Sequence, residues 1–184
     1  MNQHVDIREV SLRDGLQIEA PIPLAAKLEL LAAVAATGVR EVEATAFVSP
    51  SKVPSMADAA ELAARLHEYP DIEFSALVAS PNGAKRAVAA GLRSIEYVVA
   101  ASDAFSEANV GRGSAEATEQ IGEIVAIAHD SGVTVEVIVA TAWIAPSRGP
   151  PRPSGCSRSA RPPAIGVSTG SRSPTPSAPP RHDG

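Results

Sequence analysis

The sequence has little aromatic content and a single cysteine. Aromatic residues make up 3% of its 184 residues, and Cys156 has no second cysteine with which to form an internal disulfide. The longest apolar runs, such as residues 30–36, are far shorter than the roughly 20 residues that cross a bilayer. The first nine residues lack the basic and apolar regions of a secretory signal. We therefore expect a cytoplasmic protein.

Charge divides the sequence into two unlike parts. Residues 1–143 carry 10 Lys+Arg against 20 Asp+Glu, whereas residues 144–184 carry six arginines against one acidic residue, Asp183. The second part also holds 10 of the 16 prolines and eight serines, and no hydrophobic period of 2 or 3.6 residues continues into it. The hydrophobic content of 45% is enough for one domain with a core. We expect that domain in residues 1–143 and a disordered Pro/Ser/Arg-rich tail in residues 144–184.

Strand-like and helical stretches alternate up to residue 143. Strands are predicted at residues 5–10, 39–45, 72–77, 94–99 and 134–140, and helices at residues 23–36, 56–67, 82–90 and 115–130. Gly38, Gly91 and Gly132 follow three of these helices, where a C-cap is wanted. Repeated strand–helix units indicate a parallel sheet with right-handed crossovers. Five strands are fewer than the eight of a complete (β/α)8 barrel, so the predicted fold is an incomplete TIM barrel of the α/β class.

The first two predicted strands lead into charged residues. Arg13 and Asp14 follow the first strand, and Glu43 lies near the end of the second. Active-site groups of such barrels lie at the carboxyl ends of the strands. There, Asp14 could bind a hard divalent cation and Arg13 could stabilise an enolate or alkoxide. The simpler alternatives are an Arg-Asp pair that only ties a loop, and a salt bridge between Glu43 and Arg13.

Several motifs make the pattern more specific. The sequence reads RDGLQ at residues 13–17 and E-x-T-x-FVSPxxVPxMAD at residues 43–58, with SEANV at 106–110 and ATAW at 140–143. Together they resemble the hydroxymethylglutaryl-CoA lyases, TIM-barrel metallolyases related to isopropylmalate and homocitrate synthases. The resemblance covers residues 4–143. One departure is that Ser11-Leu12 stands where Gly-Pro is common before RDGLQ.

The resemblance implies a retro-Claisen cleavage of 3-hydroxy-3-methylglutaryl-CoA to acetoacetate and acetyl-CoA. Asp14 would be a ligand of Mg²⁺ or Mn²⁺, which polarises substrate oxygens. Arg13 would stabilise the enolate of the departing acetyl-CoA and bind substrate. Glu43 and Gln17 would shape the site, Glu43 as a second catalytic residue and Gln17 as a substrate-binding residue. The resemblance also implies an H-x-H pair, an asparagine ligand and a catalytic cysteine in the second half of the barrel, and this sequence shows none of them.

The histidines and the cysteine do not replace those groups. His4 precedes the first strand, at the end away from the site, and His67 and His129 lie near predicted helix C-termini, where a cation suits the helix dipole. His182 lies in the tail. Cys156 has Ser, Arg and Pro neighbours and no nearby base, which favours an inert thiol.

The change of character after Trp143 suggests a shifted reading frame. The family continues with CPFEG or CPYEG, whereas residues 143–149 read WIAPSRG. A gene reading TGG GAT TGC CCC TTC GAG GG encodes WDCPFEG. Loss of one G after the tryptophan codon gives TGG ATT GCC CCT TCG AGG G, which encodes WIAPSRG. Restoring the frame over residues 172–178 permits SLADTIG, similar to the strand-six motif of the family. The tail is therefore interpreted as out of frame and the chain as truncated and inactive.

Two other functions stay open at this stage. One is another member of the family, such as an isopropylmalate-type acyl-CoA condensing enzyme, although the FVSP…VPxMAD segment favours the lyase. The other is a non-catalytic half-barrel with a basic binding tail, although six arginines without interleaved aromatics indicate nucleic-acid binding only weakly. The expected partner is a small acyl-CoA, with no nucleic acid or membrane, and homo-oligomers are expected for full-length relatives. The half-barrel itself would have two open strand edges and a tendency to aggregate.

Overall fold

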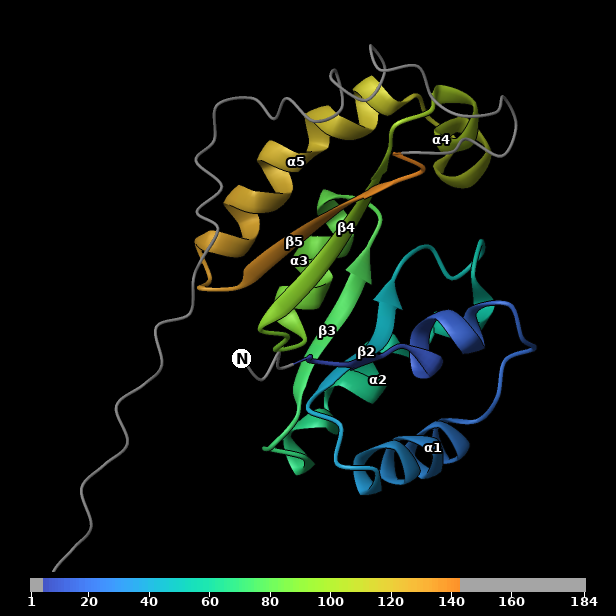
Figure 1. The fold of residues 1–184 in the computed structure, drawn as a ribbon, viewed down its shortest axis with the longest axis vertical. Coiled ribbons are helices and arrows are strands. Elements are labelled where there is room, and N and C mark those ends of the chain that lie inside the picture. The colour runs from blue at the N-terminus through green and yellow to red at the C-terminus, as the bar shows by residue number, and fades with distance from the viewer. Residues whose placement is uncertain (1–4, 143–184) are drawn as a thin grey trace, which may run out of the picture.

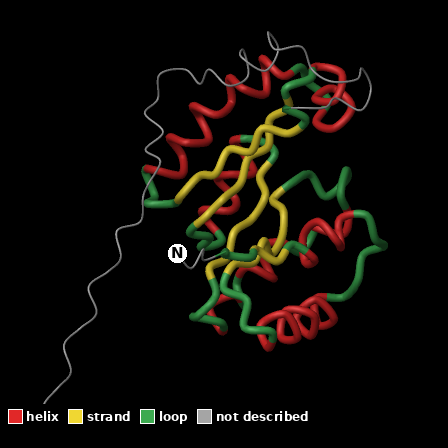
Figure 2. Tube along the Cα trace, in the orientation of Figure 1, coloured by secondary structure: helices red, strands yellow, loops and turns green. Residues whose placement is uncertain are grey.

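The computed structural model describes residues 5–142 (Figures 1 and 2). Its strands are β1 (Arg8–Glu9), β2 (Glu41–Phe47), β3 (Glu73–Val78), β4 (Ser94–Ala100) and β5 (Thr134–Ala140). Its α-helices are α1 (Leu24–Ala36), α2 (Ala59–Ala63), α3 (Pro81–Ala89), α4 (Asp103–Val110) and α5 (Ser114–His129). Three short helical turns are η1 (Ser11–Gly15), η2 (Pro54–Met56) and η3 (Leu66–Glu68).

The five strands form one parallel sheet. They lie in the order β1-β2-β3-β4-β5, and each strand pairs with its neighbours in the parallel direction. A parallel sheet in sequential order, with helical crossovers between its strands, is the arrangement of a (β/α)8 barrel. The predicted fold class, an incomplete TIM barrel, is confirmed.

The core lies between one face of the sheet and the helices. Sheet residues such as Val42, Ala76 and Ile95 form one buried apolar cluster with helix residues such as Leu31 and Ile124. The opposite face, concave and polar, carries the buried carboxylates of Glu43 and Glu96. The two faces therefore have different roles. One packs against the helices and stabilises the fold, and the other places charged side chains in the barrel interior.

Three elements differ from the sequence prediction. The helix expected at residues 56–67 is divided into η2, α2 and η3. The segment at residues 103–110 forms α4, whose start is capped by Ser102 Oγ and whose end is Gly111 in the left-handed conformation at φ 75°. β1 has only two residues, so Arg13 and Asp14 lie in the π-helical turn η1 and not at the end of a strand. Within residues 5–142, the helices all lack the length and apolar character needed to cross a membrane.

Candidate active site

The turn η1 positions the Arg-Asp pair directly after β1. The backbone N–H groups of Arg13 and Asp14 donate to the carbonyl of Val10 at 3.1 and 2.7 Å, which closes the turn tightly. Leu12 is 1% exposed and belongs to the apolar core, so it anchors η1 beneath the two charged residues. The turn thus holds Arg13 half-buried and leaves Asp14 exposed.

Arg13 joins the two carboxylates that the sequence singled out. Its Nη1 donates to Asp14 Oδ1 at 2.9 Å, and its Nη2 donates to Glu43 Oε2 at 2.7 Å. The structure therefore brings Arg13, Asp14 and Glu43 into one cluster. The salt bridge between Glu43 and Arg13, considered above as the simpler alternative, is present. Such a bridge fits a structural role and a positioning role equally well.

Glu43 is the deeply buried member of this cluster. The residue is 1% exposed, and burial raises the pKa of its carboxyl, while the hydrogen bond and charge of Arg13 oppose that rise. Within the described residues, Glu43 Oε1 and Arg13 Nε are buried without a hydrogen-bond partner. A buried carboxylate oxygen without a donor is costly unless a proton, a water or a cation reaches it.

Gln17 lies where η1 leads into the following loop. Its backbone carbonyl accepts a hydrogen bond from Ser55 Oγ at 3.2 Å, so this point of the chain is tied to η2. Lys27 of α1 also binds the segment that contains Ser55. Its Nζ donates at 2.5 Å to both the carbonyl of Ser55 and the carboxylate of Asp58. The VPSMAD segment therefore connects η1 with α1.

Lys27 was not selected as a site residue from the sequence. It is 1% exposed, which is rare for a lysine. The sequence feature that could have indicated its burial is that Lys27 is a single cation in the otherwise apolar inner face of the helix LAAKLELLAAVAA. A lysine at a core-facing position needs acceptors, and the buried Ser55 carbonyl and the partly buried Asp58 of the MAD motif provide them.

The described residues offer part of a divalent-metal site. Asp14, whose side chain is 66% exposed, supplies hard carboxylate oxygens beside the buried Glu43. However, residues 5–142 contain no group of three or more His, Cys, Asp or Glu side chains placed to hold a metal. His67 lies in η3 and His129 ends α5, as their predicted helix-end positions require. Asp14 could therefore supply one ligand of a cation, and residues 5–142 do not complete the set.

The other motif residues lie in or beside the described elements. SEANV at residues 106–110 forms most of α4, and Ser106 is 2% exposed with a hydroxyl that has no partner among the described residues. Thr141, in the ATAW motif, has a positive φ of 54° directly after β5. His4, Cys156, His182 and the expected tail at 144–184 lie outside the described residues.

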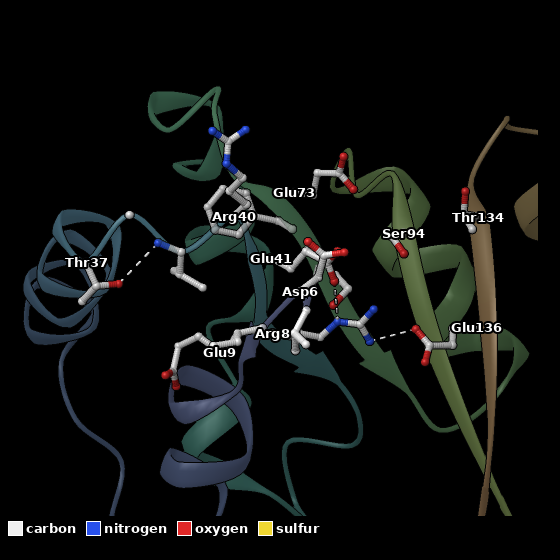
Figure 3. A pocket seen from close by; sticks show the side chains of 16 residues that line it. Asp6, Arg8, Glu9, Thr37, Arg40, Glu41, Glu73, Ser94, Thr134 and Glu136 are labelled. Atoms are coloured by element: carbon white, nitrogen blue, oxygen red, sulfur yellow. Dashed lines mark hydrogen bonds and ion pairs between the residues drawn. The ribbon is translucent and has the colours of Figure 1, made fainter. Parts of the chain in front are cut away.

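A cavity of about 990 Å³ opens at the other end of the sheet, at the amino-terminal ends of the strands. Arg8 lies in it, and its Nη1 donates to Glu136 at 2.8 Å (Figure 3). The same nitrogen donates to the buried Glu96 at 2.9 Å. Arg8 Nε also donates to Glu41 at 3.4 Å. Because parallel barrels carry their chemistry at the carboxyl ends of the strands, this polar layer is better explained as interior packing than as the active site.

Comparisons with known proteins agree on one family. The HMGL-like family matches residues 4–147. The 3-hydroxy-3-methylglutaryl-CoA lyase, cytoplasmic, of Rattus norvegicus is 36% identical over 148 residues, which are 80% of this chain and 43% of the relative.

Two solved structures match the fold as well. The HMG-CoA lyase of Brucella melitensis has a TM-score of 0.77 and 33% identity, over 83% of this chain and 54% of that one. An HMG-CoA lyase of Acinetobacter baumannii, in complex with coenzyme A and 3-methylmalate, has a TM-score of 0.77 and 29% identity, over 83% of this chain and 50% of that one. The chain thus spans about half the length of the relatives it matches.

Proposed function

The chain belongs to the HMGL-like family, and on that premise we propose that it carries the Arg13–Asp14–Glu43 part of a hydroxymethylglutaryl-CoA lyase active site. The reaction is the carbon–carbon cleavage of 3-hydroxy-3-methylglutaryl-CoA to acetoacetate and acetyl-CoA, as in leucine degradation. The observation that carries the proposal is Arg13, whose guanidinium contacts Asp14 and Glu43 at 2.9 and 2.7 Å. The guanidinium of Arg13 is thereby held as a fixed positive charge that faces the place where negative charge develops during the cleavage.

Each residue has a distinct role in this proposal. Asp14, exposed beside Arg13, would be one ligand of Mg²⁺ or Mn²⁺, which would polarise substrate oxygens when bound. Arg13 stabilises the enolate that leaves as acetyl-CoA. Glu43 fixes the guanidinium by a hydrogen bond from a position that is 1% exposed, so the donor is oriented before substrate arrives. Gln17, whose backbone carbonyl is held by Ser55, would bind substrate.

The acyl-CoA substrate is supported by the Acinetobacter relative, whose structure contains coenzyme A. The cytoplasmic location is supported by the name of the rat relative. We also propose that residues 144–184 are read out of frame and that this chain, whose residues 5–142 hold no complete metal site, does not catalyse the reaction. Resequencing the gene across the codons for residues 143–146 tests the frame, because one additional G would restore CPFEG.

Turnover assays test the activity. The frame-restored protein, supplied with Mg²⁺ or Mn²⁺, is expected to release acetoacetate from the substrate, whereas the present chain is not. In the restored protein, Arg13→Gln should lower kcat by about 10²–10³-fold, the scale of losing one preorganised donor. Arg65→Gln, on the surface of the domain, is the matched control and should leave kcat unchanged. Condensation of acetyl-CoA with a 2-oxo acid, without cleavage activity, would instead indicate an isopropylmalate-type enzyme.

A further inference from the structure

Lys27 occupies an unusual place for a cation. It is the fourth residue of α1, and the first turn of this helix contains no acidic side chain. Positive charge is unfavourable at the amino-terminal end of a helix, because the helix dipole is positive there. The residue is also only 1% exposed, and burial removes its ammonium group from water at a cost. Since apolar side chains in place of a buried ion pair are often neutral or better for stability, stability alone does not explain a lysine at this position.

Both partners of Lys27 lie in one short segment, residues 55–58. Its Nζ donates to the Ser55 carbonyl and to Asp58 Oδ1, each at 2.5 Å. Ser55 lies in η2, and Asp58 directly precedes α2. Because η2 has three residues and α2 has five, neither is long enough to fix the segment by its own hydrogen bonds. One ammonium group therefore ties both ends of the segment to α1.

The same segment contacts both parts of the candidate active site. Ser55 Oγ donates to the carbonyl of Gln17 at 3.2 Å, just after η1. Thr45 Oγ1 donates to Met56 Sδ at 3.6 Å, and Thr45 lies on β2 two residues after Glu43. Ser55, Met56 and Thr45 are each at most 4% exposed, so these contacts are made in the interior. Residues 55–58 thereby connect the turn that carries the cation of the site with the strand that carries its buried carboxylate.

We propose that Lys27 is a positioning residue for the candidate active site: by fixing residues 55–58, it holds η1 against β2. In that arrangement Arg13 Nη2 meets Glu43 Oε2 at 2.7 Å. The ammonium group acts on the site through the segment, since both of its hydrogen-bond acceptors belong to it. The effect of Lys27 on η1 follows from these contacts alone, whereas its effect on catalysis rests on the proposed lyase function.

Hydrogen exchange of the full chain tests the positioning role. The backbone N–H groups of Arg13 and Asp14 donate to the Val10 carbonyl and report on the closure of η1. In Lys27→Met these two amides should exchange about tenfold faster than in the wild type, because η1 opens locally more often. Ile124→Ala is the matched control, since it removes a fully buried side chain from α5 and destabilises the core elsewhere. Figure 1 shows α5 and α1 at opposite ends of the sheet, so this variant should leave exchange in η1 at the wild-type rate.

Ser55→Ala tests the route, and it decides the question if Lys27→Met does not fold. The substitution removes the hydroxyl that holds Gln17 but keeps the carbonyl that binds Lys27. Exchange of the two η1 amides should again accelerate, and the double variant should be no faster than Lys27→Met alone, because both changes break one chain of contacts. Faster exchange confined to residues 53–58, or equal acceleration of η1 in Ile124→Ala, would overturn the proposal.

The frame-restored protein tests the catalytic consequence. Lys27→Met should lower kcat per folded molecule about 10²-fold, the scale of a displacement of about 1 Å in an active site. Ile124→Ala should reduce the folded fraction but leave kcat per folded molecule unchanged. Equal kcat values for Lys27→Met and the wild type would overturn the catalytic part of the proposal. If the restored wild type shows no lyase activity, the proposed function fails, and exchange in the present chain still decides the role of Lys27.

Discussion

Arg8 on β1 donates a hydrogen bond of 2.8 Å to Glu136 on β5, although β2, β3 and β4 separate these strands in the sheet. A flat sheet would hold first and fifth strands roughly 19 Å apart. The contact therefore requires a strongly curved sheet, in which the side chains of β1 and β5 meet across the concave face (Figure 3). The same guanidinium also donates to Glu41 and Glu96, so one cation contacts three carboxylates.

Replacing Arg8 with alanine should destabilise the fold by about 3 kcal/mol, the scale of breaking a buried ion pair. The reason is Glu96, which is 2% exposed and would keep only the hydrogen bond from Ser75 Oγ at 2.6 Å. Urea unfolding followed by circular dichroism measures the change. Adding Glu96→Gln to Arg8→Ala should restore part of the loss, because the amide carries no charge into the interior.

Arg65→Ala is the matched control for that experiment. Arg65 pairs with Glu68 on the surface, where the two side chains are 48% and 40% exposed. Water screens the attraction between exposed charges, so the midpoint of unfolding should barely move. Equal losses in Arg8→Ala and Arg65→Ala would show that the interior charge layer does not stabilise the curved sheet.

Lys27→Met should cost about 3 kcal/mol even though it replaces a charged side chain in the core with an apolar one. The substitution leaves the Ser55 carbonyl without a donor and Asp58 without its cation, both in the segment that is tied to Gln17. Hydrogen exchange should accelerate in residues 53–58 before it changes in β4. Lys85→Met is the control, since Lys85 is 61% exposed and 3.8 Å from Glu123, and its effect should stay within about 0.5 kcal/mol.

Gly83→Ala should destabilise the junction between α3 and β2. A Cβ at position 83 would lie 2.5 Å from the carbonyl oxygen of Phe47, a backbone atom that cannot move without shifting the strand. Overpacking of this kind costs about 1–3 kcal/mol. At Gly15 the nearest atom to an added Cβ is Ser11 Cβ at 3.6 Å, so Gly15→Ala should change the free energy of unfolding by less than about 1 kcal/mol. Thermal melts of both variants distinguish the two positions.

The strand pattern could be predicted from sequence because buried parallel strands are continuous apolar runs bounded by turns. Gly38, Gly91 and Gly132 marked helix ends correctly and have φ values of 81°, 86° and 69°. α4 was missed because eight residues give too few turns for a clear amphipathic period. The short β1 was also missed, since the turn η1 replaces the end of the expected strand through three hydrogen bonds to Val10 that no local pattern announces.

The candidate site could be predicted only in part, because some of its contacts join residues that are far apart in the sequence. Arg13 and Asp14 follow β1 and Glu43 lies in the neighbouring strand β2, so their chemically distinctive side chains could be expected near one another, and the structure brings them together. Lys27 and Arg8 act through tertiary partners 28 to 128 residues away, and such pairings depend on the curvature of the whole sheet. Sequence periodicity contains no information about which distant carboxylate a buried cation will meet.

The buried position of Glu43 predicts a specific dependence of stability on pH. Burial raises the pKa of Glu43 above its ordinary 4.5, so the folded chain binds this proton more tightly than the unfolded chain does. The resulting stabilisation is complete below about pH 4.5 and is lost as the pH rises through the higher folded-state value. Glu43→Gln has no proton to lose. The free energy of unfolding of the wild type, minus that of Glu43→Gln, should therefore fall as the pH rises from 4.5 toward 7.

Glu9 provides a control of opposite sign on the same sheet. The backbone N–H of Ser11 donates to its carboxylate at 2.6 Å and lowers its pKa, so its contribution is present above its ordinary value and is lost as the pH falls. The difference between wild type and Glu9→Gln should consequently rise with pH, while the Glu43 difference falls. Urea unfolding at a series of pH values measures both differences. Parallel pH profiles for the two variants would mean that burial does not dominate the titration of Glu43, and that Arg13 compensates its charge fully.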